Sequence, residues 1–259
     1  MQKKIKQFLA DYFPEISRKI YHTLNRIIYR GNKYYCPVCE KNYISFFPAG
    51  DNAAGNSKCP GCSSLERQRL LWLFLEKHLL IKNRRIRLLN VAPDRAIQNK
   101  LKSLDNIDYI SIDLSSGIAM HKQDLTKLGF ADNSFDLVLC YHVLEHIVDD
   151  RKAMKELYRV TKPGGLAIIQ TPVEYDREKT FEDLNITTPD ARRKLFGQED
   201  HVRTYGNDYF ERLRLVGFDV VKNYFVNTFM PAEIEKFVLD KNEILCCCSK
   251  IENVNHTIE

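Results

Sequence analysis

The sequence predicts a doubly wound α/β domain that follows an amphipathic helical segment and a small cysteine-rich module. Three observations support this prediction. Short apolar runs alternate with helical patterns over residues 84–250, which is typical of a mostly parallel sheet with helices on both faces. Four cysteines cluster within residues 34–64, and apolar residues recur every three or four positions in residues 1–30. We therefore divide the chain into residues 1–33, 34–64, 65–83, 84–250 and 251–259.

The N-terminal segment, residues 1–33, is basic and amphipathic. Residues 1–35 carry a net charge of +6, whereas the remaining 224 residues carry −1. Pro14 is expected to open a second helix within this segment. Such a helix packs on its own domain or on a second copy of the chain, or it binds an anionic membrane surface. The almost neutral remainder of the chain argues against a broad nucleic-acid footprint.

The sequence also bears on the cellular compartment. No apolar stretch approaches the roughly 18 residues that span a membrane, and no signal-peptide core follows the basic start. We therefore expect a cytoplasmic protein, which lies at the membrane periphery if its N-terminal helix binds lipid. The spacing of the cysteines indicates reduced thiols and a metal rather than a secreted disulfide framework.

The cysteine-rich module contains two Cys-x2-Cys pairs, separated by 19 residues. This spacing is typical of a zinc ribbon, in which four thiolates surround the ion tetrahedrally. A module of about 30 residues is too small to form a sufficient hydrophobic core, so it needs a bound metal ion to stabilise it. We expect a structural Zn²⁺, because four thiolates leave no open position for a catalytic water. The expected ligands are Cys36, Cys39, Cys59 and Cys62.

A leucine-rich connecting helix at residues 65–80 is expected to join this module to the α/β domain. In doubly wound sheets ligands bind beyond the carboxyl ends of the strands, so the residues that follow each strand are the candidate site. We expect strands at 86–91, 108–112, 135–140, 166–171, 219–226 and 243–249. We expect helices near 95–103, 150–160 and 207–216.

One long segment carries a family resemblance. The string DLTKLGFADNSFDLVLCYHVLEHIVDDRKAMKELYRVTKPGGLAIIQTP resembles class I S-adenosylmethionine-dependent methyltransferases of the broad type 11 kind. The later string HVRTYGNDYFERLRLVGFDVV resembles the end of the same domain. Together the similarity covers residues 84–250 and points to a bacterial subgroup with an N-terminal zinc-ribbon-like module. It implies a seven-stranded Rossmann-like sheet, methyl transfer, and S-adenosylmethionine as cofactor.

The resemblance also implies roles for individual residues. Asp113 would bind the ribose hydroxyls of the cofactor, and Asp124 would bind the adenine amino group with Leu125 beside the ring. Cys140 precedes the segment implied to face the methyl-donor pocket. The other residues implied to line the cofactor site are Asn90, Val91, Ala92, Pro93, Leu114 and Tyr141.

The loop after the first strand lacks the glycines that this family has. Ala92 takes the place of the first glycine and Ala96 that of the last. S-Adenosylmethionine has no phosphate, so its site does not require the bare backbone that a pyrophosphate needs. An alanine is tolerated at negative φ but strained at positive φ. Two alternatives follow: either Ala92 has a negative φ and the pocket is open to S-adenosylmethionine, or the loop closes the pocket and Asp113 and Asp124 have lost their role.

Three histidines are candidate catalytic bases. The string His142-Val-Leu-Glu145-His146 matches an inverted zinc-protease motif, but that motif needs one sustained helix and His142 directly follows a strand. In a methyltransferase, His142 and His146 would lie near the methyl-donor pocket. His201 lies in an insertion, residues 172–205, that is expected to cover the substrate, and it is our first candidate base. A structural hydrogen bond is the alternative role for each histidine.

We infer the substrate class from the sequence motif that follows the fourth strand and from the position of Cys140. After the fourth strand the chain has Cys140-Tyr141-His142-Val143 rather than the Asn/Asp-Pro-Pro-Tyr turn of enzymes that methylate exocyclic amines of bases. Cys140 ends a strand expected to be buried, so it is a poor nucleophile. We expect transfer to oxygen or nitrogen of a small or carrier-linked acceptor, such as a sugar or a lipid-linked intermediate. A zinc-ribbon RNA methyltransferase and a non-catalytic scaffold are the alternatives.

Overall fold

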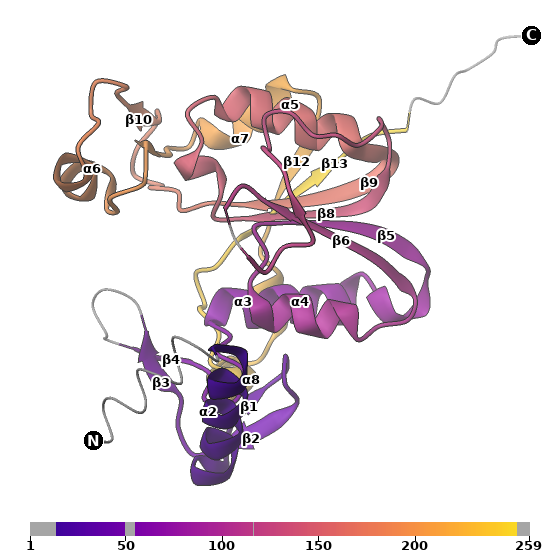
Figure 1. The fold of residues 1–259 in the computed structure, drawn as a ribbon, viewed down its shortest axis with the longest axis vertical. Helices are drawn as coiled ribbons and strands as arrows, with labels where there is room; N and C mark the ends of the chain where they lie inside the picture. Colours follow the sequence, from indigo (N-terminus) through magenta and orange to yellow (C-terminus); the bar gives the residue numbers. More distant parts are fainter. Residues whose placement is uncertain (1–13, 50–54, 116, 253–259) are drawn as a thin grey trace, which may run out of the picture. The chain divides into compact units, whose positions relative to one another are not determined.

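The computed structural model describes residues 14–49, 55–115 and 117–252. The chain forms two compact units, one made of residues 1–81 and 224–243 and the other of residues 82–223 and 244–259 (Figure 1). The start of the predicted helical segment and the end of the predicted tail lie outside the described residues. Within the described ranges, no helix is both long and apolar enough to cross a bilayer.

The first unit contains two small antiparallel hairpins, β1–β2 and β3–β4, with helices around them. Helix α2 begins at Pro14, as predicted. The predicted connecting helix is interrupted: an α-helix passes into a π-helix at Phe74. The elements are α2 (Pro14–Ile28), β1 (Arg30–Cys36), β2 (Lys41–Tyr43), β3 (Phe47–Ala49), β4 (Gly55–Lys58), α3 (Glu66–Leu73), η1 (Phe74–His78), η4 (Phe225–Thr228) and α8 (Pro231–Phe237).

Helix α2 presents an apolar stripe that the described residues leave largely uncovered. Ile16, Ile20, Leu24 and Ile27 recur at three- or four-residue intervals, and each is at least half exposed. The amphipathic pattern predicted from the sequence is therefore present as a helix with an accessible apolar face.

Residues 224–243 depart from the predicted domain boundaries. We expected residues 84–250 to form one continuous domain, but this segment groups with the N-terminal unit. Arg69 of α3, which is fully buried, holds it there: its guanidinium donates to the carbonyl oxygens of Phe237 at 2.7 Å and Val238 at 2.5 Å. The same guanidinium donates to Ser57 and Ser64, on either side of the second cysteine pair.

The second unit is built on a seven-stranded sheet, which confirms the fold predicted from the sequence. The strand order is β12-β13-β9-β8-β5-β6-β7, and only β13 runs antiparallel to its neighbours. The strands are β5 (Ile86–Val91), β6 (Ile107–Asp113), β7 (His121–Lys122), β8 (Phe135–Tyr141), β9 (Thr161–Gln170), β12 (Asp219–Asn223) and β13 (Leu245–Ser249). The two-residue strand β7 is too short for the sequence pattern to reveal it.

Helices cover both faces of this sheet (Figure 1). Helices α5 (Asp150–Val160) and α7 (Tyr209–Leu215) lie on one side and α4 (Arg95–Lys102) on the other. Alternate strand residues such as Leu89 and Val91 pack in the core beneath α5 and α7. The central strands β5 and β8 are buried on both faces, as expected of a doubly wound sheet. The 3₁₀ helix η2 (Ile81–Asn83) precedes β5.

A buried arginine binds the insertion after β9 to the rest of the domain. This insertion contains β10 (Phe181–Glu182), α6 (Pro189–Phe196) and β11 (Arg203–Thr204). Arg203 is 2% exposed, and its guanidinium donates to the carbonyls of Leu144, Ile147 and Val148 in the loop after β8. Its Nε bonds Glu182 at 2.8 Å. The insertion and the β8 loop are therefore fixed to each other around the 3₁₀ helix η3 (Leu144–His146).

Replacing Arg203 by methionine should destabilise the protein strongly. The substitution removes the guanidinium that donates to three carbonyls and leaves Glu182 with Arg212 as its arginine partner. We expect a loss of about 3 kcal/mol in the free energy of unfolding, measured with urea. R203K, which keeps the charge but not the planar set of donors, should recover only part of it. Arg177→Met, which removes an exposed pair with Glu174, should cost less than about 0.5 kcal/mol. Equal effects of R203M and R177M would contradict this role.

Candidate functional site

The segments predicted to bind ligand meet at one edge of the sheet. Strands β5, β6, β8 and β9 are parallel, so their carboxyl ends lie along the same edge. Val91 pairs with Ile112 and with Cys140, and Tyr141 pairs with Gln170. The residues that follow these strands are therefore neighbours, as the sequence predicted.

Asn90 does not point into an open site but belongs to a buried polar network. It is 6% exposed, and its Nδ2 donates to the Tyr109 hydroxyl at 3.1 Å. Tyr109 donates in turn to Gln98 of α4 at 3.2 Å, and Ser111 reaches the same Gln98 oxygen at 3.3 Å. Burial raises the pKa of Tyr109 to about 12, so it stays a neutral donor. This network fixes α4 against β5 and β6 behind the opening loop.

Ala92 has a φ of +47°, so the alternative with a negative angle is wrong. A positive φ is the angle that a glycine would adopt at this position, and it does not by itself close the pocket. Its amide donates to the Ile112 carbonyl at 2.8 Å, which extends the contact between β5 and β6 by one residue. The left-handed backbone is the conformation for which glycine is the default residue. The chain therefore keeps the backbone of a glycine loop at a position that carries a methyl group, with some strain. Directly after it, Asp94 caps α4 by accepting from the Ile97 amide at 3.0 Å.

Asp113 and Asp124 occupy tight turns at this edge. The Oδ1 of Asp113 accepts from the Ser115 amide at 2.7 Å, and the Oδ1 of Asp124 accepts from the amide and hydroxyl of Thr126 at 2.8 and 2.9 Å. These turns fix the direction of both carboxylates.

The two leucines implied to lie at the cofactor differ in burial. Leu125 is 5% exposed and belongs to the core, whereas Leu114 is 61% exposed. Leu114 is therefore the more accessible of the two.

His142 and Glu145 lie close to each other beyond β8. His142 has a φ of +53°, and its Nδ1 lies 3.3 Å from Oε1 of Glu145. The Glu145 side chain is 3% exposed, and its Oε2 accepts from the Thr171 hydroxyl at 2.8 Å. Burial alone would raise the pKa of Glu145, but the interactions with His142 and Thr171 outweigh it and hold that pKa below its usual value. Glu145 is therefore a buried carboxylate.

His146 and His201 meet beside Glu145. Their rings are nearly perpendicular, with centroids 4.7 Å apart. The Nδ1 of His146 lies 3.2 Å from Asp200, and the Nδ1 of His201 lies 3.0 Å from the Phe196 carbonyl. The motif His142 to His146 does not form one helix, because only a three-residue 3₁₀ turn follows the left-handed residue His142. This geometry agrees with the argument against a zinc protease.

Sequence reasoning identified the three histidines but not Glu145, Thr171 or Asp200. The adjacent residues Glu145-His146 were a usable signal, whereas the approach of His201 from 55 residues further along depends on how the insertion folds.

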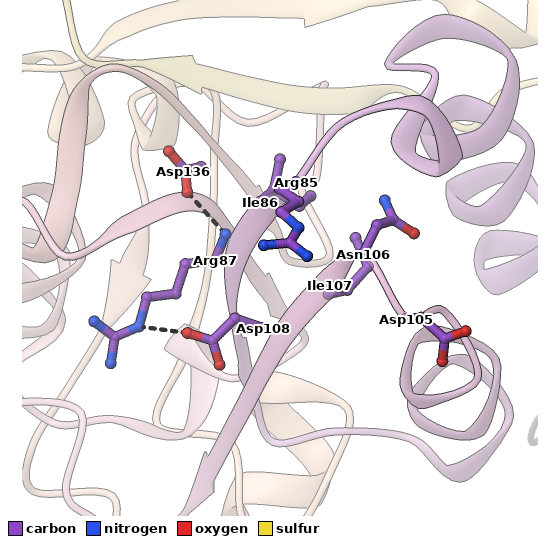
Figure 2. Close-up of a pocket in the computed structure, with 8 residues that line it drawn as sticks. All are labelled: Arg85, Ile86, Arg87, Asp105, Asn106, Ile107, Asp108 and Asp136. Atoms are coloured by element: carbon purple, nitrogen blue, oxygen red, sulfur yellow. Dashed lines mark hydrogen bonds and ion pairs between the residues drawn. The ribbon is translucent and has the colours of Figure 1, made fainter.

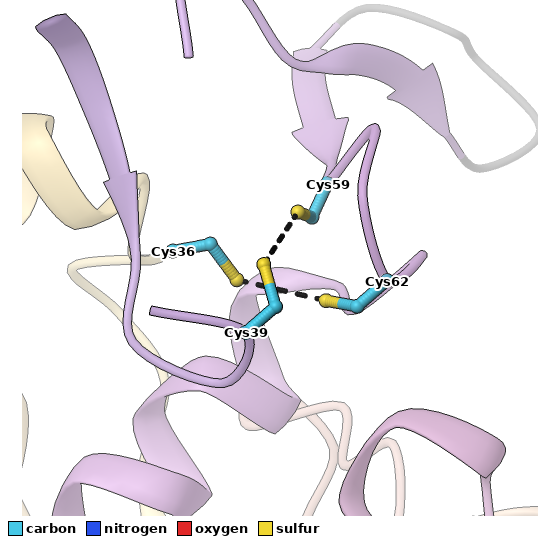
Figure 3. A group of neighbouring side chains, drawn as sticks. All are labelled: Cys36, Cys39, Cys59 and Cys62. Atoms are coloured by element: carbon cyan, nitrogen blue, oxygen red, sulfur yellow. Dashed lines mark hydrogen bonds between the residues drawn. The ribbon is translucent and has the colours of Figure 1, made fainter. Parts of the chain in front are cut away.

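The four predicted zinc ligands converge in the first unit (Figure 3). Cys36 ends β1, Cys39 lies in the β1–β2 turn, and Cys59 and Cys62 come from the loop after β4. Their Sγ atoms all lie within 4.8 Å of one another, with 3.7 Å from Cys36 to Cys62 and from Cys39 to Cys59. The buried guanidinium of Arg69 lies close enough to interact with their charge. Such an arrangement suits one tetrahedral ion.

A further pocket lies at the opposite edge of the sheet (Figure 2). It is formed at the amino ends of β5, β6 and β8, away from the candidate site. Arg87 pairs with Asp108 at 3.1 Å, and its amide donates to Asp136 at 2.8 Å. Arg87 and Asp108 neutralise each other, and Asp136 already accepts a hydrogen bond, so these side chains do not indicate a ligand site.

Residues 88–169 match the family described as a methyltransferase domain. This part of the chain is a methyltransferase domain. The match confirms the resemblance inferred from the motifs between β7 and β9. The methyltransferase domain extends beyond the matched residues, because β12 and β13 complete the same sheet.

Two curated relatives match parts of the methyltransferase domain. An uncharacterized methyltransferase of Schizosaccharomyces pombe is 39% identical over 85 residues, which are 27% of this chain and 31% of the relative. A demethylmenaquinone methyltransferase of Renibacterium salmoninarum is 33% identical over 94 residues, which are 32% of this chain and 40% of the relative. The chain thus spans less than half the length of these relatives.

Among solved structures, the [4+2]-cyclase SpnF is similar, with a TM-score of 0.50 and 16% sequence identity over 80% of this chain and 88% of that chain. This likeness shows the fold alone.

Replacing Ala92 by glycine should relieve the strain in the opening loop. We expect the free energy of unfolding to rise by about 0.5–1 kcal/mol, because glycine adopts a positive φ without the penalty of a Cβ atom. Urea unfolding measures the change. Ala96 lies in the first turn of α4, so the matched change Ala96→Gly should instead destabilise by about 0.5 kcal/mol. A destabilising A92G would show that the methyl group of Ala92 is needed for packing.

Proposed function

We propose that this protein transfers a methyl group from S-adenosylmethionine to oxygen or nitrogen of a small or carrier-linked acceptor. When bound, the cofactor supplies an electrophilic methyl group on a sulfonium. The observation that carries the proposal is the gathering of Ala92, Asp113, Asp124 and Tyr141 at one edge of a methyltransferase sheet. The domain match and the curated relatives, which are named as methyltransferases, support it.

The carboxylates suit the polar ends of this cofactor. Asp113 follows β6 and would accept hydrogen bonds from the ribose diol, while Asp124 would accept from the adenine amino group. Because each is already oriented by its own turn, little ordering is required on binding. The opening loop between β5 and α4 would receive the methionine part of the cofactor.

The histidine cluster would lie on the acceptor side of this site. Tyr141 ends β8 and His142 directly follows it; because β8 is the neighbour of β5, both adjoin the opening loop in the sheet. His142 and His146 are the accessible reactive side chains beside the buried Glu145, since 31% and 32% of them are exposed. His201 is 7% exposed and offers its Nε2 only, because Nδ1 is bonded to Phe196. Acceptor binding near these side chains is part of the proposal.

We also propose that the four cysteines hold a structural Zn²⁺. A zinc ion with four thiolates carries a net charge of −2, and the fully buried Arg69 provides a compensating charge beside it. The first unit has few other means of stabilising its short hairpins.

Isothermal titration calorimetry with S-adenosylmethionine tests the cofactor site. Asp113→Asn keeps the turn but loses the carboxylate charge, and we expect the Kd to rise about 10-fold or more, as for the loss of a charged hydrogen bond. Asp124→Asn should weaken binding in the same direction. Asp108→Asn is the matched control: it lies on the same strand β6 at the opposite edge and should leave the Kd unchanged within about 2-fold.

The same titration separates the alternative functions. Absence of binding by the wild-type protein would favour a non-catalytic scaffold. Salt-sensitive retention of RNA, together with cofactor binding, would favour an RNA methyltransferase. A Kd for D113N and D124N equal to that of wild type would contradict the assigned cofactor site.

Removing the proposed zinc ion should unfold the first unit. A mercurial that reacts with thiols should release about one Zn²⁺ per chain, because the four cysteines provide one closed site. Tryptophan fluorescence should report the unfolding through Trp72, the protein's only tryptophan, which is fully buried in α3. Replacing Cys246 by serine provides a control that removes a buried thiol elsewhere and should leave the zinc content unchanged. A zinc-free protein with unaltered fluorescence would contradict the site.

A further inference from the structure

We propose that Glu145, His146 and His201 bind a second divalent metal ion at the acceptor side of the methyltransferase domain. One ligand atom from each of these residues lies within 4.8 Å of the other two. The three residues come from the loop after β8 and from the insertion that contains β11, so the fold brings them together from distant parts of the sequence. This site is separate from the four cysteines, which belong to the other unit.

The histidines are oriented as metal ligands usually are. A ligating histidine commonly donates its second ring N–H to a carboxylate or a backbone carbonyl, which fixes the tautomer. Here Nδ1 of His146 faces the Asp200 carboxylate at 3.2 Å and Nδ1 of His201 faces the Phe196 carbonyl at 3.0 Å. In both rings this leaves Nε2 with its lone pair, as metal binding requires.

Glu145 supplies an anionic ligand that the described residues satisfy only in part. Its Oε2 accepts from Thr171, whereas Oε1 makes no hydrogen bond of regular geometry and has only Nδ1 of His142 at 3.3 Å. A carboxylate that is 3% exposed is costly to bury without strong partners. A cation at Oε1 would complete its interactions, so this buried oxygen is a second and independent indication of the site.

The scaffold around the ligands is rigid on one side and accessible on the other. Arg203 fixes the carbonyls of Leu144 and Ile147, which flank Glu145 and His146. The amide of Val202, next to His201, donates to the Glu145 carbonyl at 2.9 Å. The side chain of His146 is 32% exposed, so an ion can enter past it.

The donor set indicates the class of ion. Two imidazoles and one carboxylate suit borderline divalent ions such as Zn²⁺, Co²⁺, Fe²⁺ or Mn²⁺ rather than Ca²⁺. With ligand distances near 2.1 Å, two ligands of one ion are at most about 4.2 Å apart, so closing the site requires side-chain shifts of less than about 1 Å. Three protein ligands leave further positions open for water or another oxygen ligand.

The metal site deepens the proposed function and, in this respect, rests on it. An acceptor hydroxyl bound to the ion would lose its proton to solvent more readily. The acceptor oxygen would then form a bond to the methyl carbon while the carbon–sulfur bond breaks and its electron pair stays on sulfur. The metal site therefore favours a hydroxyl acceptor over a nitrogen acceptor.

Titration with Co²⁺ tests the site in the full-length protein after dialysis against EDTA under conditions that retain the cysteine-bound zinc. We expect about one added Co²⁺ with weak visible d–d absorption and no thiolate-to-cobalt charge-transfer band, which distinguishes nitrogen and oxygen ligands from the cysteines. His146→Ala, His201→Ala and Glu145→Gln should each weaken Co²⁺ binding about 100-fold or more. Asp200→Asn, which disturbs only the orientation of His146, should weaken it about 10-fold.

Controls separate this result from general effects. His121→Ala removes an exposed histidine of β7 outside the cluster and should bind Co²⁺ as wild type does. Urea unfolding shows whether a variant is folded, and the exposed side chain of Asp200 makes D200N informative even if H201A does not fold. Absence of the additional Co²⁺, or unchanged binding in H146A and D200N, would overturn the metal site. S-Adenosylmethionine binding is measured without Co²⁺, so failure of the metal site and failure of the proposed function are distinguishable.

Discussion

The arrangement of the candidate site depends on one buried guanidinium, that of Arg203. It donates to three backbone carbonyls in the loop after β8 and to Glu182 in the insertion. Arg212 of α7 pairs with the same Glu182 and with Asp150 at the start of α5. A buried arginine requires several acceptors at once, so it imposes a unique geometry on the segments that supply them. Arg203, together with the bond from the Val202 amide to the Glu145 carbonyl, fixes the place where Glu145 and His201 meet.

Two of the non-glycine residues with a left-handed backbone lie at the same edge of the sheet. Ala92 follows β5 and His142 follows the adjacent strand β8, and both have φ near +50°. Each amide still donates to the next strand, Ala92 to Ile112 and His142 to Gln170. The sheet therefore continues for one residue and then turns sharply away at both positions. Non-glycine residues in this conformation persist where the surroundings over-determine them, which is common at functional sites.

Sequence pattern alone predicted the sheet and the order of its segments, because apolar runs and helical periodicity are local properties. It placed β5, β6 and β8 to within one residue, and it selected the four cysteines and the residues at the carboxyl edge. It did not predict the φ of Ala92, because the angle is set by pairing with β6 rather than by the alanine itself. The pattern predicts one strand over residues 219–226, but β12 ends at Asn223. Phe225 belongs to the N-terminal unit, where it packs against Phe74 of the same unit. The backbone angle of Ala92 and the end of β12 both depend on tertiary contacts, which a local sequence pattern does not contain.

Because residues 224–243 belong to the N-terminal unit, that unit cannot be completed until most of the chain has been synthesised. Arg69 bonds carbonyls that lie 168 and 169 positions later in the chain. At roughly 5–20 residues per second, the ribosome needs roughly 10–30 s to make the intervening chain, during which the guanidinium lacks these acceptors. The four cysteines have all been synthesised before that interval begins. The N-terminal unit is encoded by two separated stretches of the gene. A fragment that ends at residue 81 would therefore always lack the carbonyl acceptors of Arg69.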